Sequence, residues 1–512
     1  MSAPTGSGLD PYAAVRETHA GVVFLVGDRA YKMKKPVDLA FLDFRTLAAR
    51  AESCRREVAL NRRLAPDVYL GVADVLGTDG LPCEHLVVMR RMPDGRRLSG
   101  LVRDRAPLDE ELRRIARLVA AFHSHCDRSP AIAVEGSRDA LQARWAASFE
   151  QVRPFHGPVL RHTTAAEVER LTMRFLAGRE PLFAARMRQG HVLDGHGDLL
   201  ADDIFCLPDG PRILDCLEFD DRLRHLDQLD DVAFLAMDLE HLGAPESAAR
   251  LLRWYVEFSG DPAPPSLLHH YLAYRAFVRA KVACLRHAQG DPTAADEARV
   301  LAEMTHRHLA TAAVAVVLVG GLPGTGKSTL AGALADHLGW SLLGSDRVRK
   351  ELAGLAADQP AGAPYREGIY SPAWTERTYA ELLGRAEKLL ALGESVVLDA
   401  SWTDRASRAA AADTARRTHS DLVALRCEAP ADVAGSRMRG RRGVSDADES
   451  VAAAMRAEAD AWQEAAVVAT TAAPDEVLRQ ALALVRPGPA ERQWLAAPRE
   501  VTGSAASGSS PS

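Results

Sequence analysis

The stretch VAVVLVGGLPGTGKST, residues 314–329, decides the fold of the C-terminal part of the chain. Its first six residues are apolar and mostly β-branched, which is typical of a parallel strand buried on both faces. The pattern G-x-x-x-x-G-K-[ST] follows directly, and the amphipathic segment 329–337 comes after it. A strand, a glycine-rich turn and a helix in this order form a cradle of backbone N–H groups for phosphate. We therefore expect this stretch to bind a nucleotide.

The residues of the turn have separate expected roles. The glycines let the backbone curl so that successive N–H groups point at phosphate oxygens. Lys327 is expected to reach the β- and γ-phosphates, and Ser328 to ligate Mg²⁺. The predicted cofactors are therefore ATP and Mg²⁺. The predicted nucleotide contacts of the loop are Gly321, Leu322, Pro323, Gly324, Thr325, Gly326, Lys327, Ser328 and Thr329.

The composition is that of an ordinary water-soluble protein. A length of 512 residues is enough for about three lobes with their own cores. The net charge of −6 gives no reason to expect a nucleic-acid partner. Seven cysteines without a C-x-x-C pair favour reduced thiols. The N-terminus has no signal-peptide pattern and no apolar run is long enough to span a bilayer, so we expect a cytoplasmic protein without a membrane partner. Nothing here indicates an oligomeric state.

The expected domain organisation follows from composition shifts along the chain. The first and last segments are small and polar, which predicts flexible ends. The predicted divisions are a flexible N-terminus (1–10), a first domain (11–311) with a small lobe (about 11–95) and a helical large lobe (about 96–311), a second domain (312–487) and a disordered tail (488–512).

The N-terminal part begins with signals for a hairpin and a helix. Segment 21–35 alternates across a Gly-Asp turn and returns as a strand that carries Lys32 and Lys34. Segment 50–64 reads as a helix with Glu57 in its middle, and 86–92 reads as another strand. A strand lysine, a helix glutamate and a strand leading into a loop is the order of parts in the small lobe of a protein-kinase-like fold.

Segment 191–221 carries the chemistry of this half. His196 and Asp198 precede two strand-like runs, 203–207 and 212–217, joined by a Pro-Asp-Gly turn. Three carboxylates, Asp198, Asp203 and Asp215, therefore surround one hairpin. One carboxylate can accept or orient the proton of an attacking hydroxyl, and the other two can hold Mg²⁺ against ATP phosphates.

The motif H-G-D-x₄-D followed by I-L-D resembles the catalytic and metal-binding segments of aminoglycoside phosphotransferases and their relatives, which have a kinase-like fold. The resemblance implies that Asp198 is the catalytic base, His196 its structural neighbour and Asp215 a metal ligand. It also implies that a strand lysine, with Lys32 preferred to Lys34, binds the ATP phosphates and that Glu57 is its helix partner.

The chain departs from this family at Asp203, where asparagine is expected. Aspartate can still ligate Mg²⁺, but it adds negative charge beside the triphosphate. One alternative is therefore that the N-terminal lobe is a degenerate regulatory or binding module. The acids that follow would suit a polycationic acceptor, although two of them, Asp230 and Asp231, read as helix-start acids. These acids are Asp220, Asp221, Asp227, Asp230 and Asp231.

After the glycine-rich loop, strands alternate with helices. Strand-like runs occur within 340–354, 395–401 and 421–429, which predicts a parallel sheet with right-handed crossovers. Ligands of such sheets lie beyond the carboxyl ends of the strands, where Asp346 and Asp399 fall. The segment SRMRGRRGVSDADES contains four arginines and has the composition of a mobile lid that closes on a transferring phosphoryl group.

This half resembles small-molecule P-loop kinases of the gluconate and shikimate kinase type, and it is also similar to zeta toxins and polynucleotide kinases. The shared segment S-D-x-x-R is Ser345, Asp346 and Arg349 here. The resemblance implies that Asp346 is a base or orients the substrate and that Arg349 contacts it. It further implies that Asp399 is a metal or substrate aspartate and that Arg437 and Arg441 belong to the lid.

The sequence therefore predicts two domains: an α+β bilobal kinase-like N-terminal domain and an α/β P-loop NTPase C-terminal domain with a parallel sheet. The fusion resembles bacterial proteins that join an aminoglycoside phosphotransferase-like region to a P-loop domain. The predicted function is transfer of the γ-phosphate of ATP to a hydroxyl of a small molecule, such as a sugar or aminocyclitol, at one or both sites. A further alternative is that the P-loop half acts on a nucleic-acid end or a nucleotide sugar.

Overall fold

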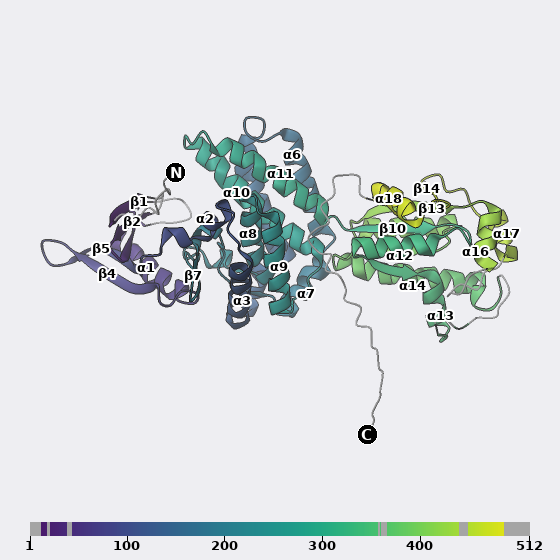
Figure 1. Ribbon diagram of the computed structural model, residues 1–512, viewed down its shortest axis with the longest axis horizontal. Coiled ribbons are helices and arrows are strands. Elements are labelled where there is room, and N and C mark those ends of the chain that lie inside the picture. Colours follow the sequence, from purple (N-terminus) through teal and green to yellow (C-terminus); the bar gives the residue numbers. More distant parts are fainter. Residues whose placement is uncertain are drawn as a thin grey trace, which may run out of the picture. The chain divides into compact units, whose positions relative to one another are not determined.

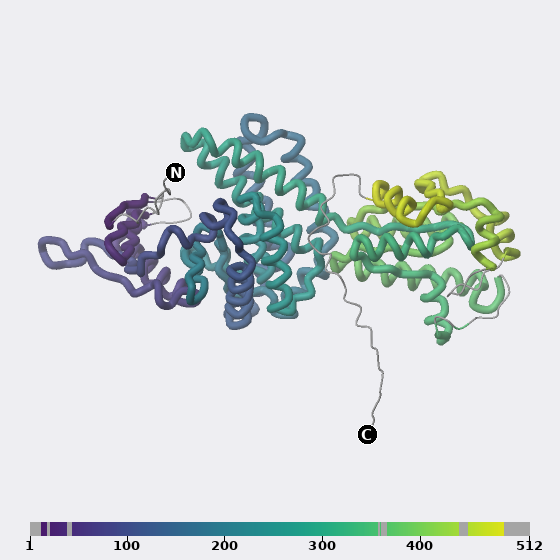
Figure 2. Tube along the Cα trace, in the orientation of Figure 1, coloured from purple at the N-terminus to yellow at the C-terminus, as the bar shows by residue number. Residues whose placement is uncertain are grey.

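The computed structural model describes residues 12–17, 21–37, 44–356, 359, 366–439 and 449–485. The chain forms two compact units, shown in Figure 1 and as a Cα trace in Figure 2. The first contains residues 1–315, 385–394 and 411–421, and the second contains 316–384, 395–410 and 422–512. The predicted flexible end 1–10, the predicted tail 488–512 and the predicted lid residue Arg441 lie outside the described residues.

The first unit begins with a five-stranded antiparallel sheet in the order β1-β2-β3-β5-β4. The strands are β1 (Ala13–Glu17), β2 (Gly21–Val26), β3 (Arg29–Lys34), β4 (Tyr69–Leu76) and β5 (Pro82–Arg90). The predicted hairpin turn is present, and Gly27 adopts φ +58°, which glycine tolerates without strain. Apolar residues of this sheet and of helix α1 (Leu47–Asn61) form one core.

Helix α1 places a carboxylate against the sheet. Thr46 caps its N-terminus by accepting a hydrogen bond from the Ala49 N–H at 3.2 Å. Cys54 and Val58 pack into the core, and Glu57 between them is fully buried. The helix begins and ends three residues earlier than the predicted segment 50–64.

The rest of the first unit is mainly helical. Helix α8 (Gln228–His241) is its centre, because every residue from 228 to 239 is buried. Helices α9 and α10 pack against α8, α3 packs against α9, and α11 packs against α10 (Figure 1). The helices are α2 (Leu98–Arg103), α3 (Asp109–His125), α4 (Pro130–Glu135), α5 (Arg138–Val152), α6 (His162–Ala177), α7 (Glu180–Arg188), α9 (Pro245–Ser259), α10 (Pro265–Ala288) and α11 (Ala294–Ala312).

Two short antiparallel pairs interrupt these helices. Strand β6 (Val192–Asp194) pairs with β9 (His225–Asp227), and β7 (Ile204–Leu207) pairs with β8 (Gly210–Ile213). The hairpin β7-β8 confirms the predicted turn, but the predicted run 212–217 is wrong in extent because β8 ends at Ile213. Asp215 adopts φ +63°, a left-handed conformation that is incompatible with an extended strand.

The second unit is built on a five-stranded parallel sheet in the order β11-β12-β10-β13-β14. The strands are β10 (Ala315–Gly320), β11 (Ser341–Gly344), β12 (Val396–Asp399), β13 (Asp421–Glu428) and β14 (Ala466–Ala469). The sequence analysis missed β14, which is only four residues long. Strands β11 and β12 lie on one side of β10, and β13 and β14 lie on the other. The strand order therefore reverses at the end of β10, and folds of this kind bind ligands at that point.

Helices follow the strands, as predicted. They are α12 (Lys327–Leu338), α13 (Ser345–Leu352), α14 (Pro372–Ala391), α15 (Arg405–Arg417), α16 (Ala431–Arg439), α17 (Glu449–Glu458) and α18 (Pro474–Val485). Apolar residues of α12 and α18 pack on one face of the sheet and share a core with β10, β12, β13 and β14. The predicted fold class, a bilobal kinase-like domain and a P-loop domain with a parallel sheet, is confirmed. Among the helices that the structure describes, none combines the length and the apolar composition needed to cross a bilayer.

Two candidate nucleotide sites

The glycine-rich loop joins β10 to α12 at the switch point of the second unit. Gly321, Gly324 and Gly326 adopt φ values of +140°, +79° and +83°, so all three positions require a residue without Cβ. A Cβ at Gly321 would lie 2.7 Å from the Cys427 carbonyl oxygen, and one at Gly324 would lie 2.5 Å from the Ala434 carbonyl oxygen. The backbone therefore curls as a phosphate-binding loop does.

The loop is fastened from within the second unit. The Thr325 hydroxyl donates to the Leu322 carbonyl at 2.8 Å, and Thr470, after β14, donates to the Thr325 carbonyl at 2.6 Å. Lys327 begins α12, where the helix dipole favours an anion. Ser328 and Thr329 are exposed in the first turn of this helix, where a bound nucleotide could reach them.

Lys327 and Asp399 lie at the same edge of the sheet. Burial raises the pKa of the Cys427 thiol to about 12. The charges of Lys327 and Asp399 also influence this pKa, so both side chains lie near Cys427. Asp399 ends β12, so the structure places it where the sequence predicted.

Arg437 lies against the loop rather than away from it. Its guanidinium donates to the carbonyl of Thr470 at 2.7 Å and to the Thr470 hydroxyl at 3.2 Å. One of its nitrogens lies 3.5 Å from the position that a Cβ would take at Gly326. The other predicted lid residue, Arg441, lies outside the described residues.

The predicted acceptor residues lie beyond the ends of β11 and β12. Asp346 is in the first turn of α13, and Arg349 is buried with its guanidinium donating to the Ile369 carbonyl at 2.8 Å. The sequence analysis missed Tyr379 of α14. Its hydroxyl lies 3.1 Å from the Ser401 hydroxyl, and burial together with the charge of Asp346 raises its pKa. The Tyr379 hydroxyl also accepts the Trp402 N–H at 3.3 Å, so this side chain holds the loop that follows Asp399 and β12.

In the first unit, the predicted lysine, glutamate and aspartate meet. The Lys32 ammonium lies 2.9 Å from Glu57 Oε1 and 2.6 Å from Asp215 Oδ1. Burial works against the charge of Lys32, but the nearby carboxylates outweigh it and hold its pKa well above the ordinary value. The same lysine lowers the pKa of Asp215.

Lys34 occupies a different place. Its ammonium is buried, lies 2.6 Å from Glu57 Oε2 and pairs with Glu218. Of the two candidate lysines, Lys32 is therefore the one that contacts both Glu57 and the predicted metal ligand Asp215. Lys34 holds Glu57 from the other side.

Asp198 and His196 lie on one loop before β7. Burial, and then the charge of Asp215, raises the pKa of Asp198 to about 7, close to the value that suits a general base at neutral pH. Burial lowers the pKa of His196 to about 4, so its ring is neutral at pH 7. The His196 ring lies 3.1 Å from the Leu214 carbonyl through Nε2 and accepts the Asp198 N–H at 3.3 Å through Nδ1. His196 thus connects the loop that carries Asp198 to Leu214, the residue that follows strand β8.

The predicted metal ligands Asp203 and Asp215 influence each other. Burial, then the charges of Asp215 and Asp198, holds the pKa of Asp203 well above its ordinary value. Among the described residues, no group of three or more His, Cys, Asp or Glu side chains is arranged to hold a metal by itself. Two carboxylates together with ATP phosphates nevertheless make an ordinary Mg²⁺ site, so these residues fit the ion.

Asp231 holds the loop that carries His196 and Asp198, although the sequence suggested only a helix-start acid. Its carboxylate is fully buried. It accepts hydrogen bonds from the backbone N–H of His196 at 2.7 Å and of Gly197 at 2.9 Å, and it lies 3.1 Å from His123 Nε2. Despite burial, the His123 hydrogen bond and other donors hold the pKa of Asp231 far below its ordinary value. The residues that contact Asp231 lie 34 or more positions away in the sequence, so no local pattern could have shown this role.

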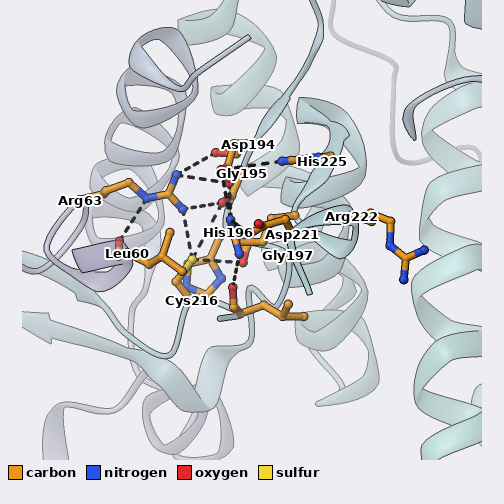
Figure 3. A network of polar contacts seen from close by, with 12 residues as sticks. Leu60, Arg63, Asp194, Gly195, His196, Gly197, Cys216, Asp221, Arg222 and His225 are labelled. Atoms are coloured by element: carbon orange, nitrogen blue, oxygen red, sulfur yellow. Dashed lines mark hydrogen bonds and ion pairs between the residues drawn. The ribbon is translucent and has the colours of Figure 1, made fainter. Parts of the chain in front are cut away.

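Further side chains hold the same loop, as Figure 3 shows around Arg63. Arg63 donates to the Asp194 carbonyl at 2.9 Å and to the Gly195 carbonyl at 2.7 Å. Arg275 of α10 donates to the Gly197 carbonyl at 3.3 Å. The sequence analysis missed both arginines.

The idea of an acidic acceptor cleft after Asp215 is wrong for these residues, because arginines or a histidine already pair with each acid. Asp220 pairs with Arg222, Asp221 with Arg56 and Arg224, Asp227 with Arg186, Asp230 with Arg275, and Asp231 with His123. Charge count along the sequence could not show these long-range partners.

Relatives that align with most of the chain are known. The chain is 43% identical over 473 residues to the uncharacterized protein Rv2004c of Mycobacterium tuberculosis and to the uncharacterized protein Mb2027c of Mycobacterium bovis. The alignment covers 90% of this chain and 95% of each relative. The chain belongs to the family of these mycobacterial proteins.

The two halves also match separate descriptions. A family model described as an AAA domain matches residues 316–462. A sugar kinase from Janibacter is 22% identical, covering 34% of this chain and 94% of that chain with a TM-score of 0.27. The complex of APH(2")-IIia with GDP and kanamycin is 18% identical, covering 57% and 93% with a TM-score of 0.38. A choline/ethanolamine kinase family protein from Mesorhizobium loti is 16% identical, covering 60% and 94% with a TM-score of 0.34. The identification of a kinase-like first half and a P-loop second half is confirmed.

Proposed function

We propose that this protein is an ATP-dependent phosphotransferase that transfers the γ-phosphate to a hydroxyl of a small molecule, such as a sugar or aminocyclitol. The observation that carries the proposal is the loop of residues 321–326, whose three glycines with positive φ lead into Lys327 at the start of α12. This arrangement lies at the switch point of a parallel sheet, where phosphate binding is favoured.

In the second unit, the chain itself would orient the two reactants. Lys327 and the loop amides would hold the phosphates, and Asp346 would orient or deprotonate the acceptor hydroxyl. Asp399 and Ser328 are the residues that would hold Mg²⁺, an ion that neutralises charge on the phosphates when it is bound. Because phosphoryl transfer requires little covalent work from the protein, this positioning supplies most of the catalysis.

We propose a second site of the same class in the first unit. Its support is the direct contact of Lys32 with both Glu57 and Asp215, next to an Asp198 whose pKa is raised to about 7. Lys32 would bind ATP phosphates, Asp203 and Asp215 would hold Mg²⁺, and Asp198 would accept the acceptor proton. The alternative is a degenerate regulatory module, and it is motivated by Asp203, which places a carboxylate where the family has asparagine.

Equilibrium binding of a non-hydrolysable ATP analogue to the full chain tests both proposals. With Mg²⁺ present we expect two sites per chain. Lys327→Ala should remove one of them, Lys32→Met should remove the other, and the double variant should bind none. A single site that Lys327→Ala abolishes would leave the first unit as a binding or regulatory module. Unchanged binding in the double variant would refute both sites.

A further inference from the structure

The first unit joins its predicted phosphate-binding half to its predicted base through one helix end. Helix α1 carries Glu57, which holds Lys32, and the helix ends at Asn61. Arg63 follows two residues later, and its side chain lies against the loop that carries Asp198 (Figure 3). The helix end is therefore the place where the small lobe meets the catalytic loop.

Every nitrogen of the Arg63 guanidinium has a partner, and the two terminal nitrogens contact the loop. Its two terminal nitrogens donate to the Asp194 carbonyl at 2.9 Å and the Gly195 carbonyl at 2.7 Å, and one of them lies 3.2 Å from Cys216 Sγ. Nε donates back to the Leu60 carbonyl at 3.1 Å. The guanidinium also lies over the Phe122 ring, 5.0 Å from its centroid, and its side chain is only 27% exposed.

Asn61 makes a second connection two residues earlier. Its side-chain N–H donates to the Glu57 carbonyl at 2.9 Å, and its side-chain oxygen accepts the Cys216 N–H at 2.8 Å. Cys216 directly follows the predicted metal ligand Asp215. The end of α1 thus contacts both the loop before Asp198 and the residue after Asp215.

We propose that Arg63 is a positioning residue that clamps the Glu57 helix onto the catalytic loop and so fixes the distance between the ATP phosphates and Asp198. This inference rests on the proposed kinase site of the first unit. A planar guanidinium suits the role because its fork holds two carbonyls in one geometry, which an ammonium cannot do. Arg63 itself touches no reacting atom.

Arg62 provides a matched control. It precedes Arg63 in the chain and also donates to two backbone carbonyls, those of Tyr69 at 2.8 Å and Leu70 at 2.6 Å. Both partners belong to β4 in the small lobe. Arg62→Met and Arg63→Met therefore remove the same kind of contact, but only Arg63→Met frees the catalytic loop.

The test uses the full chain with Lys327→Ala, so that MgATP hydrolysis reports the first unit. We expect Arg63→Met to lower kcat by tenfold to about a hundredfold with the KM for MgATP changed less than threefold, since misplacement by about 1 Å costs about this much. Arg62→Met should keep kcat within twofold, and Arg63→Lys should recover part of the loss. Hydrogen exchange of the peptide spanning residues 194–198, whose carbonyls at 194 and 195 Arg63 holds, should speed up in Arg63→Met and not in Arg62→Met.

Equal exchange in the two methionine variants would overturn the clamp, as would equal kcat values. If the parent protein neither hydrolyses nor binds MgATP, the proposed kinase site fails. In that case, the exchange comparison still decides whether Arg63 holds the loop.

Discussion

Asp231→Asn should both destabilise the first unit and impair its proposed site. The carboxylate accepts hydrogen bonds through both oxygens, from the Gly197 N–H on one side and from the His196 N–H and His123 on the other. An asparagine keeps one acceptor oxygen and turns an NH₂ group toward one of these donors. One hydrogen bond is therefore lost, two donors face each other, and the remaining bonds lose their ionic character.

The magnitude follows from these contacts. A hydrogen bond to a charged group contributes about 1.5 to 3 kcal/mol, and a buried donor left without an acceptor adds its desolvation cost. We therefore expect the free energy of unfolding of the first unit to fall by about 3 to 5 kcal/mol. Because the loop carries Asp198, kcat at this site should fall as well.

The pH dependence gives a second readout. The folded-state pKa of Asp231 is depressed, so its contribution to stability is complete above the unfolded-state value of about 3.9 and is lost as pH falls toward the folded-state value. Asp231→Asn should therefore lose less stability than the wild type on acidification from about pH 5 to about pH 2.

Asp238→Asn is the matched control in the same helix. Asp238 is buried, its pKa is raised by burial, and it accepts the Ala201 N–H at 2.9 Å, which an amide oxygen can still accept. Urea unfolding of the full chain at several pH values, together with ATP turnover, compares the two variants. A loss of less than about 1 kcal/mol in Asp231→Asn, equal to that of Asp238→Asn, would refute the reasoning.

Three further changes test individual sites. Gly324→Ala should weaken ATP-analogue binding at the second unit at least tenfold, because φ is +79° and the new Cβ would meet the Ala434 carbonyl; unchanged affinity in a titration would contradict this. Turnover at the first unit should rise with pH through about 7 as Asp198 loses its proton, and more Mg²⁺ should move this rise to lower pH by neutralising Asp215; a flat profile would exclude Asp198 as the base. Arg437→Ala should raise the KM for ATP of the second unit, because the guanidinium lies beside the phosphate loop; an unchanged KM would remove it from the site.

Much of the architecture could be predicted because its signals are local. The loop after β10 needs glycines where φ is positive, and the hairpin at Gly27 needs one too, so the sequence marks both. Lys32 and Glu57 were predicted through their order along a strand and a helix, and the structure brings them within 2.9 Å. These features depend on residues that lie close together in the chain or on motifs with a fixed order.

The parts that could not be predicted depend on distant partners. Asp231 looked like a helix-start acid because its neighbours in sequence are acidic and apolar, whereas its donors lie on α3 and on the loop before β7. Arg63 contacts carbonyls more than 130 residues away. The strand run after Arg212 was extended too far, because apolar residues recur through Leu217, whereas β8 ends at Ile213 and Asp215 is left-handed. Such roles follow from tertiary packing, which residue spacing does not encode.

The most direct test of the central claim is acceptor-dependent transfer of phosphate from ATP by the full chain, with the product identified by mass. The acceptor panel contains sugars, aminocyclitols, aminoglycosides, nucleotides and oligonucleotides, and the proteins are wild type, Lys327→Ala, Asp198→Ala and the double variant. The account predicts a phosphorylated small molecule from the wild type and no product from the double variant. Each single variant should lose the product of its own site and keep the product of the other. If only an oligonucleotide is phosphorylated, the acceptor of the P-loop half is a nucleic-acid end. No phosphorylated product from the wild type with any acceptor would contradict the account.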